Sequence, residues 1–577
     1  KTPPLAFDFV NSYYRNSGND STFGNSINHS RASSATMTNS SGTLVTVGNN
    51  VPRKGHHIHN GSAWVNEGIL HESEARTNLV TYSSNFSNGS WQKIDAGDTL
   101  SGGFTAPDGI PNAMLLAPDS TSGYHMLRRS TGFNAAPYTI SLFVKASGRR
   151  YIHIAIGGSN LGTPSYDYRR GIFDAQNGVV IAAPVNGSAN VESFGNGWYR
   201  ISAVINLLSA GGANFDITLA DTTTPTTINP TDGNGTDGIY IWGAQLEASA
   251  TLSSYIPTNG STVTRAADIL TVSAAKMPSV ATAPFAEVSG TEILTNSGFD
   301  TDTDWTKEAG WTINGGLITK APGTASNAMY QTGTFTVTPG KMYKVEIDVT
   351  VGQSGSGAIL CQFWGGGGGD TDTSPAMSSA YGAGYIGTTS TGTYTWYIIP
   401  TINRSKVGII SAGGWDGTVN SFSLKEVIPP ALSIQMEGKM TYADEDLFGS
   451  TNHDGAGQAT FYRRTAGPID YMFGGIQTGT SRTGQFIISQ RKTGAAGSSQ
   501  VFGSAFDYSP SINVPFKIAA RHGGTFINGA VEGTALTANT TPTALPDLSS
   551  TNLQLGYIYM GTIGKFVVWN EDIGDTG

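Results

Sequence analysis

The side chains with the clearest potential for ligand binding lie in and after a glycine-rich stretch in the second half of the chain. Aromatic faces stack on the C–H groups of pyranose rings, and Asp side chains accept hydrogen bonds from sugar hydroxyls. Both residue types flank the run of five glycines in WGGGGGDTDT and recur in the segments that follow it. We therefore predict a carbohydrate-binding site there, with core packing of the aromatic rings as the alternative. Its candidate residues are Trp364, Asp370, Asp372, Tyr381, Tyr385 and Trp415.

Other chemistries have less support in the sequence. The glycine run lacks the Lys-Ser/Thr of a phosphate-binding loop, and no helical pattern follows it. Gly-x-Ser-x-Gly, His-Glu-x-x-His and Cys-His signatures are missing as well. We expect no catalytic residues and no enzyme. Glycoside hydrolysis, however, needs only two carboxylates roughly 5–10 Å apart, and the 42 acidic residues leave that alternative open.

Two clusters contain metal-ligating residue types. Asp300, Asp302 and Asp304 begin like a calcium loop, but the Gly and Glu that an EF-hand requires at positions 6 and 12 are replaced by tryptophans. That departure favours an acidic, solvated turn. The run HHIH at residues 56–59 would place two imidazoles on one side of a strand, and we favour a polar turn there as well. We expect no cofactor, with a structural calcium ion as the alternative.

Composition excludes several classes of protein. The 75 glycines and 25 prolines rule out a coiled coil or helical bundle, while 38% hydrophobic residues rule out a disordered chain. A net charge of −9 without cationic runs argues against nucleic acid as a partner. No stretch approaches the roughly 20 apolar residues that cross a bilayer, so we expect no membrane insertion. The N-terminus lacks a signal-peptide pattern, and the single cysteine, Cys361, suits folding in a reducing cytoplasm.

Short strands separated by turns dominate the chain. Tyr138–Val144, Tyr199–Ile205 and Tyr343–Val349 are typical, each rich in β-branched or aromatic residues and bounded by turn formers. This rhythm predicts an all-β fold of tandem antiparallel β-sandwiches. Tryptophans within or beside these strand patterns are expected in the cores: Trp91, Trp198, Trp242, Trp305, Trp311 and Trp569.

Changes in composition divide the chain. Residues 271–290 are rich in Ala, Ser and Pro and lack alternation, and the IPPA run at 428–431 discourages a continuing sheet. The sequence therefore predicts an N-terminal strand-rich segment, two sandwiches, a linker and a C-terminal sandwich. Their boundaries are 1–77, 78–270, 271–290 (the linker), 291–428 and 429–577.

An internal repeat supports this division. NLVTYSSNFSNGSWQK at residues 78–93 and EILTNSGFDTDTDWTK at 292–307 share a Phe followed five or six residues later by a Trp and then a Lys. In each copy a Pro- or Gly-led strand follows, and a further strand closes the copy. We interpret the two copies as sandwiches of one type, each anchored in its core by the Phe and the Trp.

The first copy resembles the jelly-roll carbohydrate-binding modules of bacteriophage fibre proteins. The resemblance lies in GIYIWGAQLEASATLSSYIPTNGSTVTRAADIL at residues 238–270, which is similar to the end of such modules in head-fibre and tail-fibre proteins. Upstream, SRASSAT at 30–36, GTLVTVGNNVPR at 42–53 and EGILHESEARTNLVTYS at 67–83 complete the pattern. Together these segments extend over about half of the chain.

The C-terminal part, from Leu432, resembles the concanavalin A-like or laminin G-like sandwich. The residues that carry the resemblance are FINGAV at 526–531 and LQLGYIYMGTIGKFVVW at 553–569. In the first of them, Asn-Gly between apolar residues also predicts a tight hairpin. Members of that superfamily often bind glycans, but no ligand position of the family maps onto a particular residue here.

These resemblances imply a phage virion structural protein, a fibre or spike on the exterior of the particle, made in the host bacterial cytoplasm. The N-terminal segment would attach to other virion proteins, and the two jelly rolls and the laminin G-like domain would bind host surface polysaccharide for adsorption. A homotrimer follows from the fibre resemblance alone. Two alternatives stay open: a polysaccharide-degrading enzyme or its substrate-targeting part, and ligand-free decoration of the virion.

Overall fold

The fold was determined from a computed structural model of the whole chain. It describes residues 2–574, apart from residues 95–98, 122, 159–168, 186, 229, 231, 279–290, 324–325, 339–340, 353–356, 365–384, 399–403, 428–430, 441–457, 478–484, 494–496, 503–513, 525, 541 and 544.

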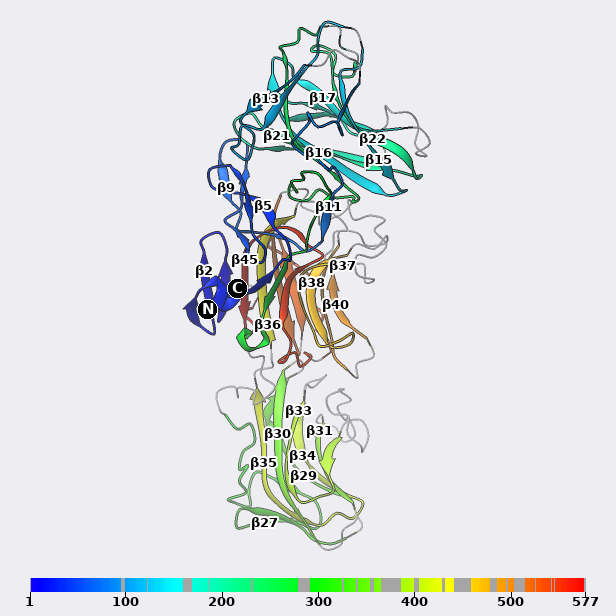
Figure 1. Cartoon of the computed structure of the whole chain (residues 1–577). Helices are drawn as coiled ribbons and strands as arrows, with labels where there is room; N and C mark the ends of the chain where they lie inside the picture. Colours follow the sequence, from blue (N-terminus) through cyan, green and yellow to red (C-terminus); the bar gives the residue numbers. More distant parts are fainter. Residues whose placement is uncertain are drawn as a thin grey trace.

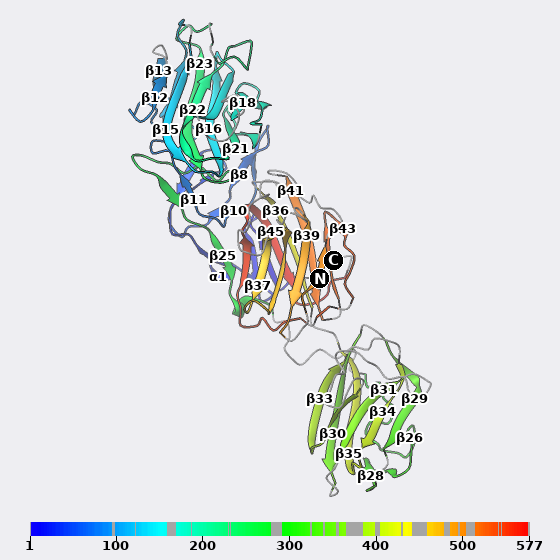
Figure 2. The ribbon, with the colours of Figure 1, turned by 90° about the vertical axis from the view of Figure 1, so that its right-hand side faces the viewer.

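The described residues form three β-sandwiches in a row, which confirms the predicted all-β class (Figures 1 and 2). We call them jelly roll 1, the central sandwich and jelly roll 2, in their order along the molecule. Both chain termini lie in the central sandwich (Figure 1). In the part of the chain that the structure describes, no helix has the length and apolarity needed to cross a membrane.

The central sandwich combines strands from both ends of the chain. Its ten-stranded sheet has the order β3 (Asn19–Ser21), β2 (Tyr13–Asn16), β1 (Leu5–Asp8), β45 (Met560–Trp569), β36 (Ala431–Met440), β41 (Pro515–Gly523), β42 (Ile527–Val531) and β43 (Thr534–Ala535), with β10 (Ile69–Glu72) beside β45 and β7 (Arg53–Lys54) beside β10. Its seven-stranded sheet has the order β4 (Asn28–Ser30), β25 (Ile269–Val272), β44 (Leu553–Tyr557), β37 (Gln458–Thr465), β38 (Tyr471–Gln477), β39 (Phe486–Arg491) and β40 (Ser499–Phe502). A short helix, α1 (Phe23–Ser26), lies between β3 and β4, and the 3₁₀ helix η2 (Ala274–Lys276) follows β25.

This pairing differs from the division made from the sequence, which separated residues 1–77 from 429–577. β1 pairs with β45 and β10 pairs with the same strand further along. One apolar core contains Phe7, Leu270 and Phe566, so both ends of the chain bury their apolar faces together. The stretch 271–290 is not wholly a linker, because Val272 and Met277 are buried in that core. Such pairings between distant segments leave no local signature in the sequence.

Jelly roll 1 is an insertion between two paired strands. The chain leaves the central sandwich through β11 (Arg76–Asn78) and returns through β24 (Val263–Arg265), which pair antiparallel. One sheet has the order β12 (Gln92–Ile94), β15 (Met126–Phe133), β22 (Gly211–Leu219), β17 (Tyr151–Gly157), β18 (Arg170–Asp174) and β19 (Val179–Ala182). The other, the β16 sheet, has the order β13 (Thr99–Phe104), β14 (Ala113–Ala117), β23 (Gly238–Glu247), β16 (Pro137–Ser147), β21 (Tyr199–Asn206) and β20 (Gly187–Ser193).

Jelly roll 2 repeats this arrangement with two five-stranded sheets. One has the order β26 (Thr306–Lys307), β29 (Asn327–Val337), β34 (Arg404–Ala412), β31 (Ala358–Trp364) and β32 (Tyr385–Thr388). The other has the order β27 (Trp311–Asn314), β28 (Leu317–Lys320), β35 (Gly417–Val427), β30 (Met342–Val351) and β33 (Gly392–Ile398). The strand order matches that of jelly roll 1 once β19 and β20 are set aside, and in both it is the order of a jelly roll.

The two copies share the aromatic anchors that the repeat predicted. The rings of Phe86 and Trp91 lie 5.0 Å apart, and Trp91 donates from Nε1 to the carbonyl of Tyr82 at 2.9 Å. Phe299 and Trp305 lie 5.6 Å apart, and the Trp305 indole donates to a carbonyl nine residues earlier at 3.1 Å. Burial confirms the core placement of all the tryptophans predicted there: Trp91, Trp198, Trp242, Trp305, Trp311 and Trp569.

An N-terminal arm, residues 31–66, covers the outer face of the β16 sheet. It contains two hairpins: β5 (Ala35–Thr38) with β6 (Leu44–Val47), and β8 (His57–His59) with β9 (Trp64–Asn66). Leu44 and Trp64 pack with Phe143 and Phe194 of jelly roll 1 in one apolar cluster. The arm therefore closes a sheet face that would otherwise meet solvent.

Candidate functional site

The predicted carbohydrate-binding residues lie at one end of jelly roll 2, and most of them fall outside the described residues. Trp364 ends β31 and Tyr385 begins β32, and these strands pair antiparallel. The backbones of the two residues therefore reach the same end of the sheet. Asp370, Asp372 and Tyr381 lie outside the described residues, as do the side chains of Trp364 and Tyr385. The site as a whole stays a prediction.

Trp415 does not belong to a surface site. Its side chain is only 1% exposed and packs in the core of jelly roll 2, where its ring stacks on Trp311 at 6.1 Å. Sugar stacking requires an accessible ring face. The expectation for Trp415 was wrong because its indole packs into the core although Gly413, in the turn just before it, is exposed.

The two clusters with metal-ligating residue types are separated into other contacts. Asp300, Asp302 and Asp304 are exposed, and Asp302 pairs with Lys307. His56 Nδ1 accepts from the backbone N–H of Thr38 at 3.2 Å, so this imidazole is held within the arm. Among the described residues, no group of three or more His, Cys, Asp or Glu side chains is arranged to hold a metal ion.

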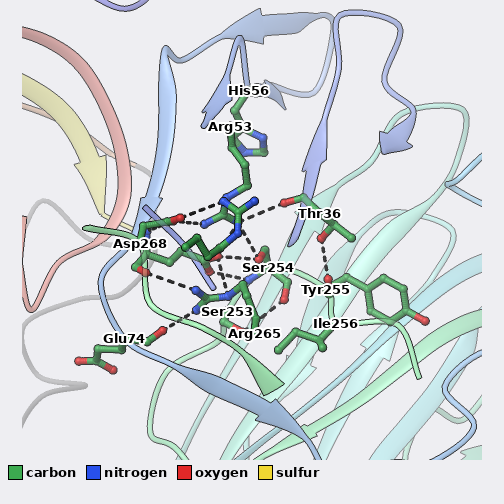
Figure 3. Close-up of polar contacts among 12 residues, drawn as sticks. Thr36, Arg53, His56, Glu74, Ser253, Ser254, Tyr255, Ile256, Arg265 and Asp268 are labelled. Atoms are coloured by element: carbon green, nitrogen blue, oxygen red, sulfur yellow. Dashed lines mark hydrogen bonds and ion pairs between the residues drawn. The ribbon is translucent and has the colours of Figure 1, made fainter. Parts of the chain in front are cut away.

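A buried network of charged groups joins the arm, the central sandwich and the end of jelly roll 1 (Figure 3). Arg53 donates to Glu72 at 2.6 Å and also bonds to Asp268. Arg31 donates to the other oxygen of Asp268 at 3.0 Å, and Arg265 lies 3.1 Å from Glu72. Each of these five residues is at most 1% exposed. Three guanidinium groups thus share two carboxylates that come from distant parts of the sequence.

Hydrogen bonds complete the network on the jelly roll side. The backbone N–H of Ser254 donates to Glu72 at 2.7 Å, and its hydroxyl donates to the same carboxylate at 2.6 Å. Arg53 also donates to the Ser254 hydroxyl and to the Thr36 carbonyl. Ser254 follows β23, so these bonds tie the closing segment of jelly roll 1 to the arm and to β10.

The charges in this network hold both carboxylates ionised. Burial alone would raise the pKa of Glu72, but Arg265 and Arg53 outweigh it and lower that pKa to about 2. Burial acts the same way on Asp268, and the charge of Arg53 with the hydrogen bond from His29 brings its pKa well below the usual range. Carboxylates that are enclosed and fully paired suit a structural clamp more than proton transfer, which needs a pKa near the working pH.

We call the five charged residues of this network the clamp: Arg31, Arg53, Glu72, Arg265 and Asp268. They all lie in the segments that carry the resemblance to phage fibre proteins, namely SRASSAT, the end of GTLVTVGNNVPR, EGILHESEARTNL and TRAADIL. Sequence reasoning used these segments for the resemblance and missed their contact. A usable signal was present, because these charged residues stand in a chain with only 13% charged residues. Scarce charges in otherwise neutral segments are candidates for buried pairs.

A cavity of about 90 Å³ lies beside the clamp, between the arm and the outer face of the β16 sheet. Thr36, His56 and Ile58 line it from the arm. Three pairs of cross-strand neighbours line it from β20 and β21: Ser188 with Val204, Asn190 with Ser202, and Glu192 with Arg200. Sequence reasoning did not find this cavity, since the arm residues that line it lie more than 120 residues before those of β20 and β21.

Comparisons with known proteins give distant structural likeness only. No protein-family model matches the chain, and no curated protein matches its sequence. The tandem CBM22 domains of Paenibacillus barcinonensis Xyn10C are similar at 8% identity over 62% of this chain and 100% of theirs, with a TM-score of 0.20. The CBM40 of a Ruminococcus gnavus sialidase, solved with α2,6-sialyllactose, has 12% identity over 26% and 81% of the chains and a TM-score of 0.19. Domains LG4-5 of the mouse laminin α1 chain are similar at 12% identity over 51% of this chain and 92% of theirs, with a TM-score of 0.16.

Proposed function

We propose that this chain is a non-catalytic fibre or spike protein on the exterior of a phage virion, where it binds host surface polysaccharide. In this proposal the three sandwiches display binding surfaces at a distance from the particle. Neighbouring copies and other virion proteins would be its partners, and a homotrimer would multiply weak sugar sites into useful avidity.

The observation that carries the proposal is the position of the clamp. The segments that resemble phage fibre proteins supply Arg31, Arg53, Glu72, Arg265 and Asp268, and these five side chains meet in one buried network. The resemblance therefore follows residues that work together in three dimensions. A clamp of this kind fixes jelly roll 1 on the central sandwich, as a display role requires.

Two measurements on the full chain test the proposal. Immunogold labelling of purified virions with antibodies raised against the chain should place gold on the particle surface. An array of bacterial surface polysaccharides should show binding by the purified chain, without the release of reducing ends. Virions that contain the chain but carry no surface gold would overturn the virion role.

The array also separates the alternatives. Release of reducing ends from a bound polysaccharide would replace the binding role by an enzymatic one. A silent array, together with unchanged adsorption when the purified chain competes with virions for host cells, would favour ligand-free decoration.

A further inference from the structure

The cavity beside the clamp is lined by polar side chains that retain unused hydrogen-bonding capacity. Arg200 is 5% exposed, and it donates to the carbonyl of Ser253 at 2.9 Å and to the hydroxyl of Ser141 at 3.2 Å. Its Nε is buried and has no hydrogen-bond partner. The side chains of Glu192 and Asn190 have none among the described residues either. Glu192 and Asn190 are partly exposed, so their polar atoms remain accessible to water or to a ligand, whereas the Arg200 Nε is enclosed.

Glu192 and Arg200 lie side by side without forming an ion pair within the described structure. They are direct cross-strand neighbours on β20 and β21, and both line the cavity. Burial raises the pKa of Glu192, and the positive charge of Arg200 opposes that rise. The arrangement keeps a strong acceptor and a strong donor next to each other, with each open to a third group.

The apolar part of the cavity combines aliphatic and aromatic side chains. Phe143 and Phe194 line it, with their rings 4.8 Å apart, and the guanidinium of Arg200 lies 5.3 Å from the Phe143 ring centre. Leu44 of the arm adds to the same apolar cluster. Because Phe143 is fully buried, a ligand here would meet polar groups on one side and Phe194 with aliphatic side chains on the other.

Charge and size narrow the class of ligand. The carboxylate of Glu192 would repel a bound anion, and the guanidinium of Arg200 would repel a bound cation. A neutral ligand therefore fits best. A hydroxyl group donates and accepts at once, and can therefore bridge the two side chains. At roughly 10–15 Å³ for each water molecule, about 90 Å³ equals the space of about six to nine waters. That space suits one small ring and not an oligosaccharide.

We propose that this cavity binds a single neutral sugar ring, with Glu192 accepting from its hydroxyls, Arg200 donating to its oxygens and the apolar lining facing its C–H groups. Ser188, on the edge strand β20, lines the cavity and is exposed. This inference rests on the glycan binding proposed above, because it names one place where the chain would hold a sugar. Jelly roll 2 lacks counterparts of β19 and β20 among its described strands, and so provides an internal control.

Saturation-transfer NMR on the full chain tests the cavity with defined probes: glucose, galactose, mannose and N-acetylglucosamine, with glucuronate and glucosamine as charged counterparts. At least one neutral ring should bind saturably, and the charged counterparts should bind about tenfold more weakly or worse, which reflects an unfavourable charge contact. Absence of saturable binding by every neutral ring would overturn the inference.

Two substitutions locate the binding. Glu192→Gln should weaken it about tenfold by removing a charged acceptor, and Asn190→Phe should abolish it by filling the cavity. Glu346→Gln, the same change on β30 of jelly roll 2, should have no effect. Circular dichroism and thermal melting check that each variant folds. Sugar binding that survives both Glu192→Gln and Asn190→Phe would overturn the inference.

The polysaccharide array separates this failure from failure of the proposed function. Array binding that is unchanged in both cavity variants leaves the glycan-binding role in place and removes the cavity from it. If a neutral sugar binds in the cavity but virions carry no surface gold, the cavity site stays in place and the virion role is removed.

Discussion

The two jelly rolls have the same strand order and the same aromatic anchors, yet the structure uses them differently. Strand β30 of jelly roll 2 alternates buried and partly exposed residues from Tyr343 to Val349, with charged side chains on its outer face. The corresponding strand β16 is buried continuously from Tyr138 to Val144. A strand that is covered on both faces reads as a continuous apolar run, and one that faces water alternates. The arm provides the second cover in jelly roll 1.

This contrast distinguishes the elements that both jelly rolls share from those that occur only with jelly roll 1. The shared strands provide two sheets and a core. The arm, the clamp and strands β19 and β20 occur only with jelly roll 1 in the described structure, and the cavity lies where the arm, the clamp and β20 meet. Glu192 on β20 therefore comes from outside the repeated unit, whereas Arg200 lies on β21, a strand that both copies share.

The largest effect is expected when the clamp is broken. Asp268→Asn would leave Arg31 and Arg53 without their shared counter-charge in a buried site, which costs about 3–5 kcal/mol. Calorimetry should show a lower melting transition for jelly roll 1 and the central sandwich, with the transition of jelly roll 2 unchanged.

The control is Asp348→Asn in jelly roll 2, where the carboxylate accepts hydrogen bonds from Thr393 and Asn420 at the sheet surface. A surface substitution of this kind changes the free energy of unfolding by about 0.5 kcal/mol or less. Equal effects of the two variants would contradict the assignment of Asp268 to a clamp.

Acid should affect jelly roll 1 more than jelly roll 2, because no histidine occurs between residues 291 and 427. Burial lowers the pKa of His153 on β17 to about 4, from 6.5 in an unfolded chain. The unfolded state then binds a proton more readily, so the contribution of His153 is complete above about pH 6.5 and falls as the pH drops through the folded pKa.

At pH 4.5, about two pH units below the unfolded pKa of His153, this effect lowers the free energy of unfolding of jelly roll 1 by about 2–3 kcal/mol. Calorimetry between pH 7 and pH 4.5 measures it, and His153→Gln should flatten the slope for jelly roll 1 alone. A slope that persists in this variant would assign the acid sensitivity to other groups, such as His56 of the arm, whose pKa burial lowers to about 3.

The sequence predicted the strands, the repeat and the core tryptophans because local alternation and spacing determine them. It also held a signal for the covered face, since YTISLFV lacks the outward charges of YKVEIDV. The pairing of β1 with β45 could not be read in this way, because it joins residues more than 550 positions apart. The same holds for the clamp and the cavity. Trp415 shows the opposite error, in which a glycine-rich turn was interpreted as exposed although its aromatic ring folds into the core.

A smaller effect should test whether the indole anchors are equivalent. Trp91→Phe and Trp305→Phe each keep an aromatic ring but remove the N–H that bonds to a carbonyl nine residues earlier. An acceptor left without its donor costs about 1–3 kcal/mol. Hydrogen exchange resolved by domain should show each variant weakening its own jelly roll by a similar amount. A cost in one copy only would mean that the shared motif anchors only that copy.

The smallest effect concerns a second shared contact, made by the tyrosine near the start of β16 and of β30. The hydroxyl of Tyr138 accepts from the backbone N–H of Asn134 at 2.9 Å, and that of Tyr343 accepts from the N–H of Thr338 at 2.9 Å. Tyr138→Phe and Tyr343→Phe remove these acceptors while keeping the buried rings, so each should cost about 0.5–1.5 kcal/mol. Because the bond closes the turn before the strand, the amide of Asn134 or Thr338 should lose its protection from hydrogen exchange in the variant.

Equal costs of the two substitutions would extend the equivalence of the two jelly rolls to these turns. An effect confined to Tyr138 would instead indicate that the arm, which covers β16 and leaves β30 open, makes the turn of jelly roll 1 depend on this bond.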